Sequence, residues 1–520
     1  MTSLSRRRMM QIAAGSLAGS LIGTSFPLTR AAGAEAVRLT VTSRIIDVYG
    51  KPARVYGILQ PNGTAGLLAD GAGDFRVALD NALDDPTLVH WHGLTPPSEQ
   101  DGVPGLSQPP LDAAAAHDYA FVNRRTGTHW MHSHLGLQEQ QLLAAPLIVR
   151  DTAEAGLDEQ DVVILLHDFS FRSPEEIYDE LRTGAGMAMS HAMEPTDDDT
   201  AQMHDGHGET MPETMGGMDH GESMDMDHGM SGDAALQMDT TGGMAGMVHA
   251  NDVEYDAYLA NDRTLANPEI VRVDPGGRLR LRIINAAAAT NFLIDLGALQ
   301  GELIAVDGDA VAPIRGSRFE LAIAQRADIR LVLPAGQGAY AILARREEGT
   351  EQTGVVLATK DGMIHHLSDH AETRTPLFGL TLERQLAALG PLPARSAERA
   401  ETLDITGSHM GYRWGFNGKV YDPNDPIRVA EGERVELVLR NMTGMHHPIH
   451  LHGHHFQVVA IDGERFSGAV RDTVLVPPSR SVTIAFDADN PGHWALHCHQ
   501  LYHMVAGMMT SILYEGYRPT

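Results

Sequence analysis

Short runs in which apolar and polar residues alternate make up most of the chain after residue 36. Such runs lie at residues 37–46, 161–166 and 482–486, and Gly, Pro and Asn residues separate them from the next runs. A period of two places every second side chain on one face of a strand. Short strands separated by turn residues are typical of Greek-key sandwiches rather than of helical or βαβ folds. The pattern therefore predicts an all-β protein.

One strand pattern occurs three times along the chain. Each copy is a Val-, Ile- or Leu-rich run that begins with Arg and ends with Asn, at residues 76–81, 280–285 and 434–441. A Gly-plus-aromatic strand follows each copy about 50 to 60 residues later. A unit of about 150 residues that recurs three times indicates tandem domains rather than a short-period solenoid. We expect β-sandwich domains at residues 36–151, 158–362 and 395–520.

Composition and charge narrow the class of protein. The chain has 520 residues, of which 43% are hydrophobic and 21% charged, as in globular proteins. After the N-terminus it contains no run of eighteen apolar residues, so we predict no membrane span. The formal net charge is −29. Such an acidic surface disfavours nucleic acid and anionic lipid and favours cations.

The first 34 residues have the features of an export signal. Ser5-Arg6-Arg7-Arg8-Met9-Met10 fits a twin-arginine consensus, and an apolar stretch and a small-x-small site at residues 32–34 follow it. We predict cleavage near Glu35, export of the folded protein by the twin-arginine route, and a periplasmic or secreted location. Loss of residues 1–34 removes four arginines and no acid, which changes the net charge to −33.

A segment rich in Met, His and Asp interrupts the second predicted domain at about residues 185–250. It holds thirteen of the 24 methionines, and no Lys or Arg occurs from residue 183 to residue 262. It has no apolar periodicity, so we expect a disordered insertion. Thioethers prefer Cu(I), whereas imidazole and carboxylate accept Cu(II). The composition favours copper collection, although a low-complexity loop whose composition drifted remains the alternative.

The only cysteine of the chain lies between two histidines, in His497-Cys498-His499. A single cysteine cannot form an internal disulfide, so the flanking histidines favour a metal ligand. In an extended strand His497 and His499 face one way and Cys498 the other. A thiolate, two imidazoles and a distant thioether form a blue-copper centre. Cys498, His503 and Met508 supply three of these groups, and the second imidazole lies upstream, in His447-Pro448-Ile449-His450-Leu451-His452.

Four His-x-His pairs provide ligands for a second metal site. They are His90 and His92, His132 and His134, His450 and His452, and His497 and His499. Eight imidazoles at strand spacing exceed the needs of one tetrahedral zinc ion and suit several redox copper ions. A nitrite reductase needs fewer pairs, so the count argues against that class. In the second predicted domain the matching strand is Ala341-Ile342-Leu343-Ala344, without a ligand. Copper is therefore expected where the first and third domains meet, with the second as a spacer.

These motifs resemble those of the multicopper oxidases. The matching segments are His-Trp-His-Gly, Trp-Met-His-Ser-His, His-Pro-Ile-His-Leu-His-Gly-His and His-Cys-His-x3-His-x4-Met, all present and in order. The resemblance implies three cupredoxin domains and four copper ions, namely one type 1, one type 2 and two type 3. It implies His447, Cys498 and His503 as type 1 ligands, with Met508 axial. It implies His90 and His450 at type 2 copper, and at type 3 copper His92, His132, His134, His452, His497 and His499.

The resemblance also assigns proton chemistry and shows one departure. Asp101 matches the acidic residue that lies beside the type 2 water in the family and helps to protonate oxygen; the alternative is a turn-forming Asp before Gly102. Many relatives carry Glu close behind the last type 1 histidine. Here Met504 and Val505 stand at those positions, and the proton donor on that side is left open.

The expected activity is oxidation of a small reducing substrate coupled to reduction of O2 to water. Cu(I), favoured by the Met-rich segment, and phenols are the leading substrates, with a role in copper tolerance. Mn(II) is a weaker third, favoured by the acidic surface. The alternatives are a periplasmic copper-sequestering protein with incidental oxidase activity, and a structural factor that has lost copper. We expect a monomer.

Overall fold

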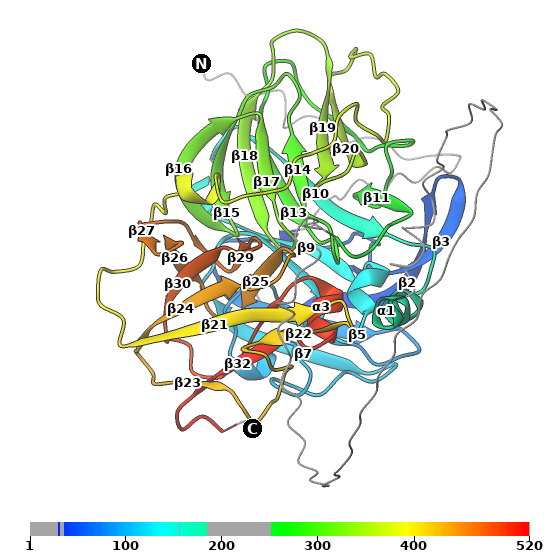
Figure 1. Ribbon diagram of the computed structural model, residues 1–520. Coiled ribbons are helices and arrows are strands. Elements are labelled where there is room, and N and C mark those ends of the chain that lie inside the picture. Colours follow the sequence, from blue (N-terminus) through cyan, green and yellow to red (C-terminus); the bar gives the residue numbers. More distant parts are fainter. Residues whose placement is uncertain (1–29, 32–35, 155, 185–250, 519–520) are drawn as a thin grey trace, which may run out of the picture.

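Strands dominate the computed structural model, which describes residues 30–31, 36–154, 156–184 and 251–518. The strands of these residues form six sheets. The sheets come in three pairs, which are blue to cyan, cyan to yellow-green, and yellow to red in Figure 1. The all-β, cupredoxin-like fold class predicted from the sequence is confirmed. The Met-rich insertion and the predicted export signal, apart from residues 30–31, lie outside the described residues.

The first pair packs a four-stranded sheet against a five-stranded one. Residues of both sheets share one apolar core, because alternate residues of each strand point inward, as Phe75, Val77 and Leu79 do. In spatial order the four-stranded sheet is β3 (Lys51–Leu59), β2 (Val37–Val48), β5 (Gly73–Asn81) and β7 (Ala116–Asn123). The other is β1 (Arg30–Ala31), β4 (Leu67–Asp70), β9 (Ala144–Arg150), β8 (Gly127–Ser133) and β6 (Val89–His90).

The second pair encloses its own core in the same way. Its larger sheet is β11 (Ala257–Ala260), β10 (Gln160–Phe169), β13 (Arg278–Asn285), β18 (Arg326–Val332), β15 (Gly301–Val306) and β16 (Asp309–Gly316). Its smaller sheet is β12 (Ile270–Arg272), β20 (Gln352–Ala358), β19 (Ala339–Arg346), β14 (Phe292–Asp295) and β17 (Arg318–Leu321).

The third pair carries the cysteine and half of the paired histidines. Its larger sheet is β22 (Arg413–Phe416), β21 (Arg399–Ser408), β24 (Arg434–Asn441), β30 (Ser481–Asp487), β26 (Phe456–Ile461) and β27 (Glu464–Arg465), and β28 (Val470–Arg471) pairs with β26. Its smaller sheet is β23 (Ile427–Val429), β32 (Met509–Tyr514), β31 (His493–Cys498), β25 (His447–Leu451) and β29 (Thr473–Val476).

The three asparagines that end the repeated strand have the same role in each pair of sheets. The side-chain amides of Asn81, Asn285 and Asn441 donate to backbone carbonyls that lie 30, 36 and 35 residues later in the chain. The carbonyl oxygen of each side chain accepts the backbone N–H two residues later. The repeated strand itself always pairs in parallel with the first long strand of its unit. The threefold repeat predicted from the sequence is therefore present, while the domain limits stay a prediction.

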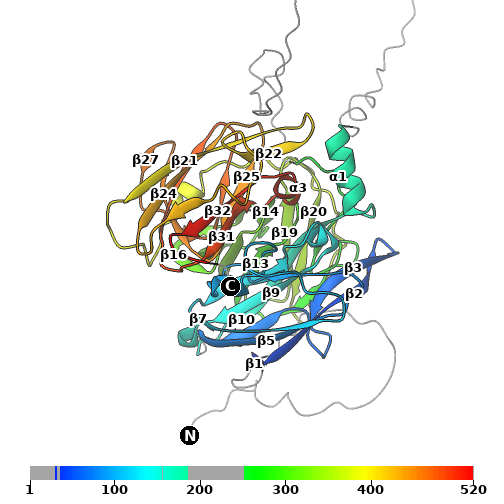
Figure 2. The same cartoon turned by 90° about the horizontal axis from the view of Figure 1, so that it is seen from below.

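Few helices accompany the sheets in the described residues. Helix α1 (Pro174–Thr183) starts with a capping box between Ser173 and Glu176 and stops at Gly184, whose φ of 69° is left-handed. Helix α3 (Leu501–Val505) follows β31 directly, and both views show it on the same side of the molecule as α1 (Figures 1 and 2). The short 3-10 turns are η2 (Ser98–Gln100), η3 (Gln138–Gln141), η4 (Thr152–Glu154) and η5 (Glu383–Gln385).

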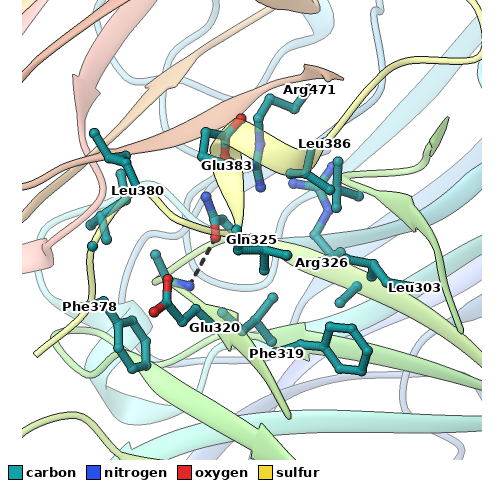
Figure 3. A pocket seen from close by; sticks show the side chains of 17 residues that line it. Leu303, Phe319, Glu320, Gln325, Arg326, Phe378, Leu380, Glu383, Leu386 and Arg471 are labelled. Atoms are coloured by element: carbon teal, nitrogen blue, oxygen red, sulfur yellow. Dashed lines mark hydrogen bonds and ion pairs between the residues drawn. The ribbon is translucent and has the colours of Figure 1, made fainter. Parts of the chain in front are cut away.

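A buried network of charges joins the second pair of sheets to the third. Arg326 of β18 donates to Asp472 over 2.7 Å, and Arg471 donates to Asp307 over 2.9 Å and also to Glu383. Arg326, Arg471 and Glu383 line a small cavity of about 30 Å³ beside the connection between the two pairs (Figure 3). Removal of a charge from water costs free energy, and a buried charge of opposite sign with good hydrogen-bond geometry is needed to offset that cost. The network therefore fixes Asp472 in place.

We expect the substitution Arg326→Met to lower the free energy of unfolding by about 3 to 5 kcal/mol, because it leaves the buried Asp472 without its cation. Urea denaturation of both proteins measures the difference. Arg480→Met is the matched control, since Arg480 and its partner Asp462 are more than a third exposed; it should cost less than about 1 kcal/mol. Equal effects of the two substitutions would contradict the role of the network.

Candidate metal centres

Cys498, His447 and His503 come together as one fully buried group. Strand β25 begins at His447 and pairs with β31, which ends at Cys498, and α3 brings His503 back over the strand end. The cysteine sulfur lies 3.7 Å from Nδ1 of His447 and 3.9 Å from Nδ1 of His503. The backbone of Met508 bonds to both Cys498 and His503. The structure thus brings together the side chains of three residues predicted for a mononuclear site, His447, Cys498 and His503, and places the backbone of the fourth, Met508, beside them.

The outward nitrogens of the two imidazoles are bound to protein groups. His447 Nε2 lies 2.7 Å from the Thr443 hydroxyl, and His503 Nε2 donates to Asp252 over 3.0 Å. Burial alone would raise the pKa of Asp252, but hydrogen bonds from His409 and His503 hold that pKa below its usual range. Because Asp252 accepts the proton on Nε2 of His503, it fixes the tautomer of that ring. The lone pair of Nδ1 then faces the Cys498 sulfur.

Burial raises the pKa of the Cys498 thiol. In these surroundings the thiol would ionise only next to a cation. Two neutral imidazole nitrogens and one buried sulfur are the donors that copper prefers. The donor set therefore fits a copper ion.

The four His-x-His pairs form a second buried group where the first and third pairs of sheets meet. His90 lies opposite His132 between β6 and β8, and His450 lies opposite His497 between β25 and β31. Rings from the two halves touch: His92 stacks on His450 with centroids 3.8 Å apart, and His90 lies 3.9 Å from His452. The eight predicted histidines therefore share one site, in which ligand atoms of several triplets lie within 4.8 Å of one another.

Many ring nitrogens inside this group lack a hydrogen-bond partner. They belong to five buried rings, namely His90, His92, His132, His450 and His499. Buried polar atoms are otherwise almost always hydrogen-bonded. Burial, followed by repulsion from neighbouring imidazoles, lowers the pKa of most of these histidines, to about 3 for His134. Neutral rings whose lone pairs face a common centre fit metal ions.

Three buried carboxylates surround the histidine group. Asp101 accepts from His452 Nδ1 over 2.8 Å, which places it beside the histidine group. Asp472 lies 3.0 Å from His92 Nε2, and Glu139 lies 2.9 Å from His132 Nδ1. Asp472, Glu139 and the Asp252 of the cysteine site are not predictable from the sequence, because single acids in turns have no distinctive local pattern.

Comparison with known proteins decides the family. Three models, each described as multicopper oxidase, match residues 67–154, 228–361 and 394–516. The chain belongs to the multicopper oxidase family. It is therefore an oxidoreductase that contains copper and uses O2 as the electron acceptor.

Relatives of the oxidase include bacterial proteins. Multicopper oxidase MmcO of Mycobacterium tuberculosis is 32% identical over 84% of this chain and 79% of its own length. Copper resistance protein A of Escherichia coli is 26% identical over 96% of this chain and 94% of its own. The fold is similar to that of the laccase from Botrytis aclada, with a TM-score of 0.69, 21% identity and coverage of 94% and 89% of the two chains.

The buried histidines should make the stability of the copper-free oxidase depend on pH. The pKa of His134 falls from its ordinary value to about 3 on folding, so between about pH 6.5 and pH 3 the unfolded chain binds more protons than the folded one. Stability is therefore present above this window and is lost as the pH falls through it. Thermal unfolding at a series of pH values measures the loss.

The matched pair of variants for this experiment is His134→Gln and His366→Gln, since His366 is exposed. The first should make the pH dependence shallower, whereas the second should leave it unchanged. An identical dependence in both variants would show that the buried imidazole does not contribute.

Proposed function

We propose that this multicopper oxidase couples four one-electron oxidations near Cys498 to the reduction of O2 to water among the paired histidines. The observation that carries the proposal is the position of Cys498 in the chain: its sulfur faces His447 and His503, while the rings of its covalent neighbours lie in the other group. Four bound copper ions would supply the one-electron chemistry at the first site and the oxygen chemistry at the second. The peptide at Cys498 gives a through-bond path between the two sites.

The proposed ligand roles follow from the family motifs and from the grouping of the side chains. His447, Cys498 and His503 would hold type 1 copper, with Met508 as the axial ligand. His90 and His450 would hold type 2 copper. The type 3 pair would be held by His92, His132, His134, His452, His497 and His499. Support comes from the unpartnered nitrogens and from the burial that keeps the rings neutral.

Asp101 is proposed to hold a proton beside the cluster. One of its carboxylate oxygens accepts from His452, and the other is buried 3.3 Å from Nδ1 of His90, without a hydrogen bond. Its place is firmly set, because the next residue, Gly102, has a φ of 81° and a Cβ there would overlap the Val89 carbonyl. Asp101 can therefore present a proton to the cluster without moving.

Cu(I) is the substrate that we propose first, with phenols second and a role in copper tolerance. The Met-rich composition of residues 187–247 supports this choice, because thioethers prefer Cu(I). Two relatives are named copper resistance protein A, which fits the same role. Asp252, which binds His503, follows the insertion by two residues. Export through the twin-arginine route to the periplasm completes the proposal. No helix of the described residues could span a membrane.

The decisive experiment measures oxygen uptake by the copper-loaded protein with Cu(I) and with a dimethoxyphenol. Cys498→Ser should abolish both reactions, because the thiolate joins the two sites. Deletion of residues 187–247 should slow Cu(I) oxidation about tenfold, equal to about 1.4 kcal/mol, and leave phenol oxidation in place. A variant with the thirteen methionines of the insertion replaced by leucine keeps the length and removes only the thioethers, and it should behave like the deletion.

The outcomes separate the competing functions. Uptake with the phenol alone, independent of the insertion, would indicate a laccase and contradict the Cu(I) proposal. Uptake with Mn(II) in preference to both would indicate a Mn(II) oxidase. Absence of Cys498-dependent uptake with any substrate would overturn the catalytic proposal and leave copper sequestration, which deletion of the insertion should then abolish.

A further inference from the structure

Glu139 lies in a turn whose position is set from both sides. The turn η3 follows strand β8, which carries His132 and ends one residue before His134, and after the turn comes Leu142, which has a left-handed φ of 62°. The side chain of Gln138 accepts from Thr87 and Ser133, and that of Gln140 accepts from Tyr255. The turn therefore cannot shift without breaking hydrogen bonds on either side of Glu139.

The carboxylate of Glu139 is 3% exposed and lies between two rings of the histidine cluster. One oxygen is 2.9 Å from Nδ1 of His132, and the other is 3.7 Å from Nδ1 of His499. The opposite nitrogen of each ring, Nε2, has no hydrogen-bond partner. The acid thus contacts the outward sides of two rings whose inward sides are free for a metal.

The same arrangement occurs at all three carboxylates around the cluster. Asp101 lies 3.3 Å from His90 and 2.8 Å from His452. Asp472 lies 3.0 Å from His92 and 3.6 Å from His450. Each acid therefore contacts one ring from the first pair of sheets and one from the third. The two remaining rings, His134 and His497, face each other across 3.2 Å.

We propose that Glu139 is a positioning residue that holds the rings of His132 and His499 in place, as the third of the three carboxylates that surround the cluster. The inference rests on the proposed role of these two histidines as copper ligands. A carboxylate or a backbone carbonyl beside the outward N–H fixes the tautomer of a ligating imidazole and makes its other nitrogen a better donor. Nδ1 of His132 lies 3.0 Å from the Ser133 carbonyl and 2.9 Å from Glu139. Met504 and Val505 follow His503 without a carboxylate, whereas Glu139 places one beside His499, four residues before His503.

The test compares Glu139→Ala and Glu139→Gln in the copper-loaded protein. Removal of an outer carboxylate typically costs about 10- to 100-fold in metal affinity. We expect Glu139→Ala to lose copper from the cluster at a chelator concentration about 10- to 100-fold lower than the unaltered protein requires. Glu139→Gln keeps the volume and one acceptor, so it should lie between the two.

Two readouts separate positioning from general damage. Metal analysis after dialysis against the chelator gives the copper content, and the visible absorption of thiolate-bound copper at Cys498 reports the other site. That absorption should not change in either Glu139 variant. Glu431→Gln, which alters an exposed acid, is the matched control and should retain all its copper.

The two proposals fail in different ways. If both Glu139 variants retain all their copper while His132→Ala loses copper, the positioning role of Glu139 is overturned and the ligand assignment stays intact. Full retention by His132→Ala as well would contradict the ligand assignment itself. Loss of the Cys498 absorption together with the cluster copper in both the Ala and the volume-matched Gln variant would show a general structural role and overturn the positioning role.

Discussion

The alternation of side chains along β31 is the constraint on which both metal centres depend. Because neighbouring residues of a strand face opposite sides, Cys498 and its two histidine neighbours cannot share one site. Antiparallel pairing with β25 then sets the opposite strand in register, so that His450 lies across from His497. A shift of one residue in this register would exchange the faces and dismantle both groups. The remaining elements hold this pair of strands in place.

The second pair of sheets contributes position rather than ligands to the described clusters. Its Arg326 donates to Asp472, which contacts His92 and His450. Asp328 of the same strand accepts from Thr128 of β8, the strand that also carries His132. Charges buried in this way are costly unless every partner is present. The predicted spacer is therefore bound to both halves of the site by charged and polar contacts as well as by packing.

The sequence was sufficient for the fold and for the histidines because those signals are local. Period-two alternation, the repeated terminal Asn and the His-x-His spacing can all be recognised within ten residues. The acids are different: Asp472 meets His92 across 380 positions, and Asp252 meets His503 across 251. An isolated Asp or Glu in a turn is common, so only the folded arrangement distinguishes these acids. The one feature of the sequence that could have indicated Glu139 is its position five residues after the predicted ligand His134.

The three carboxylates that each contact rings from both halves have a consequence for biosynthesis. A nascent chain that stops before residue 447 holds four of the eight cluster histidines and lacks Asp472, and its Asp101 and Glu139 have no second ring to contact. Closing loops of more than 300 residues costs chain entropy that only the completed interface offsets. The cluster therefore forms last, so copper can bind there only when the chain is completely synthesised and folded.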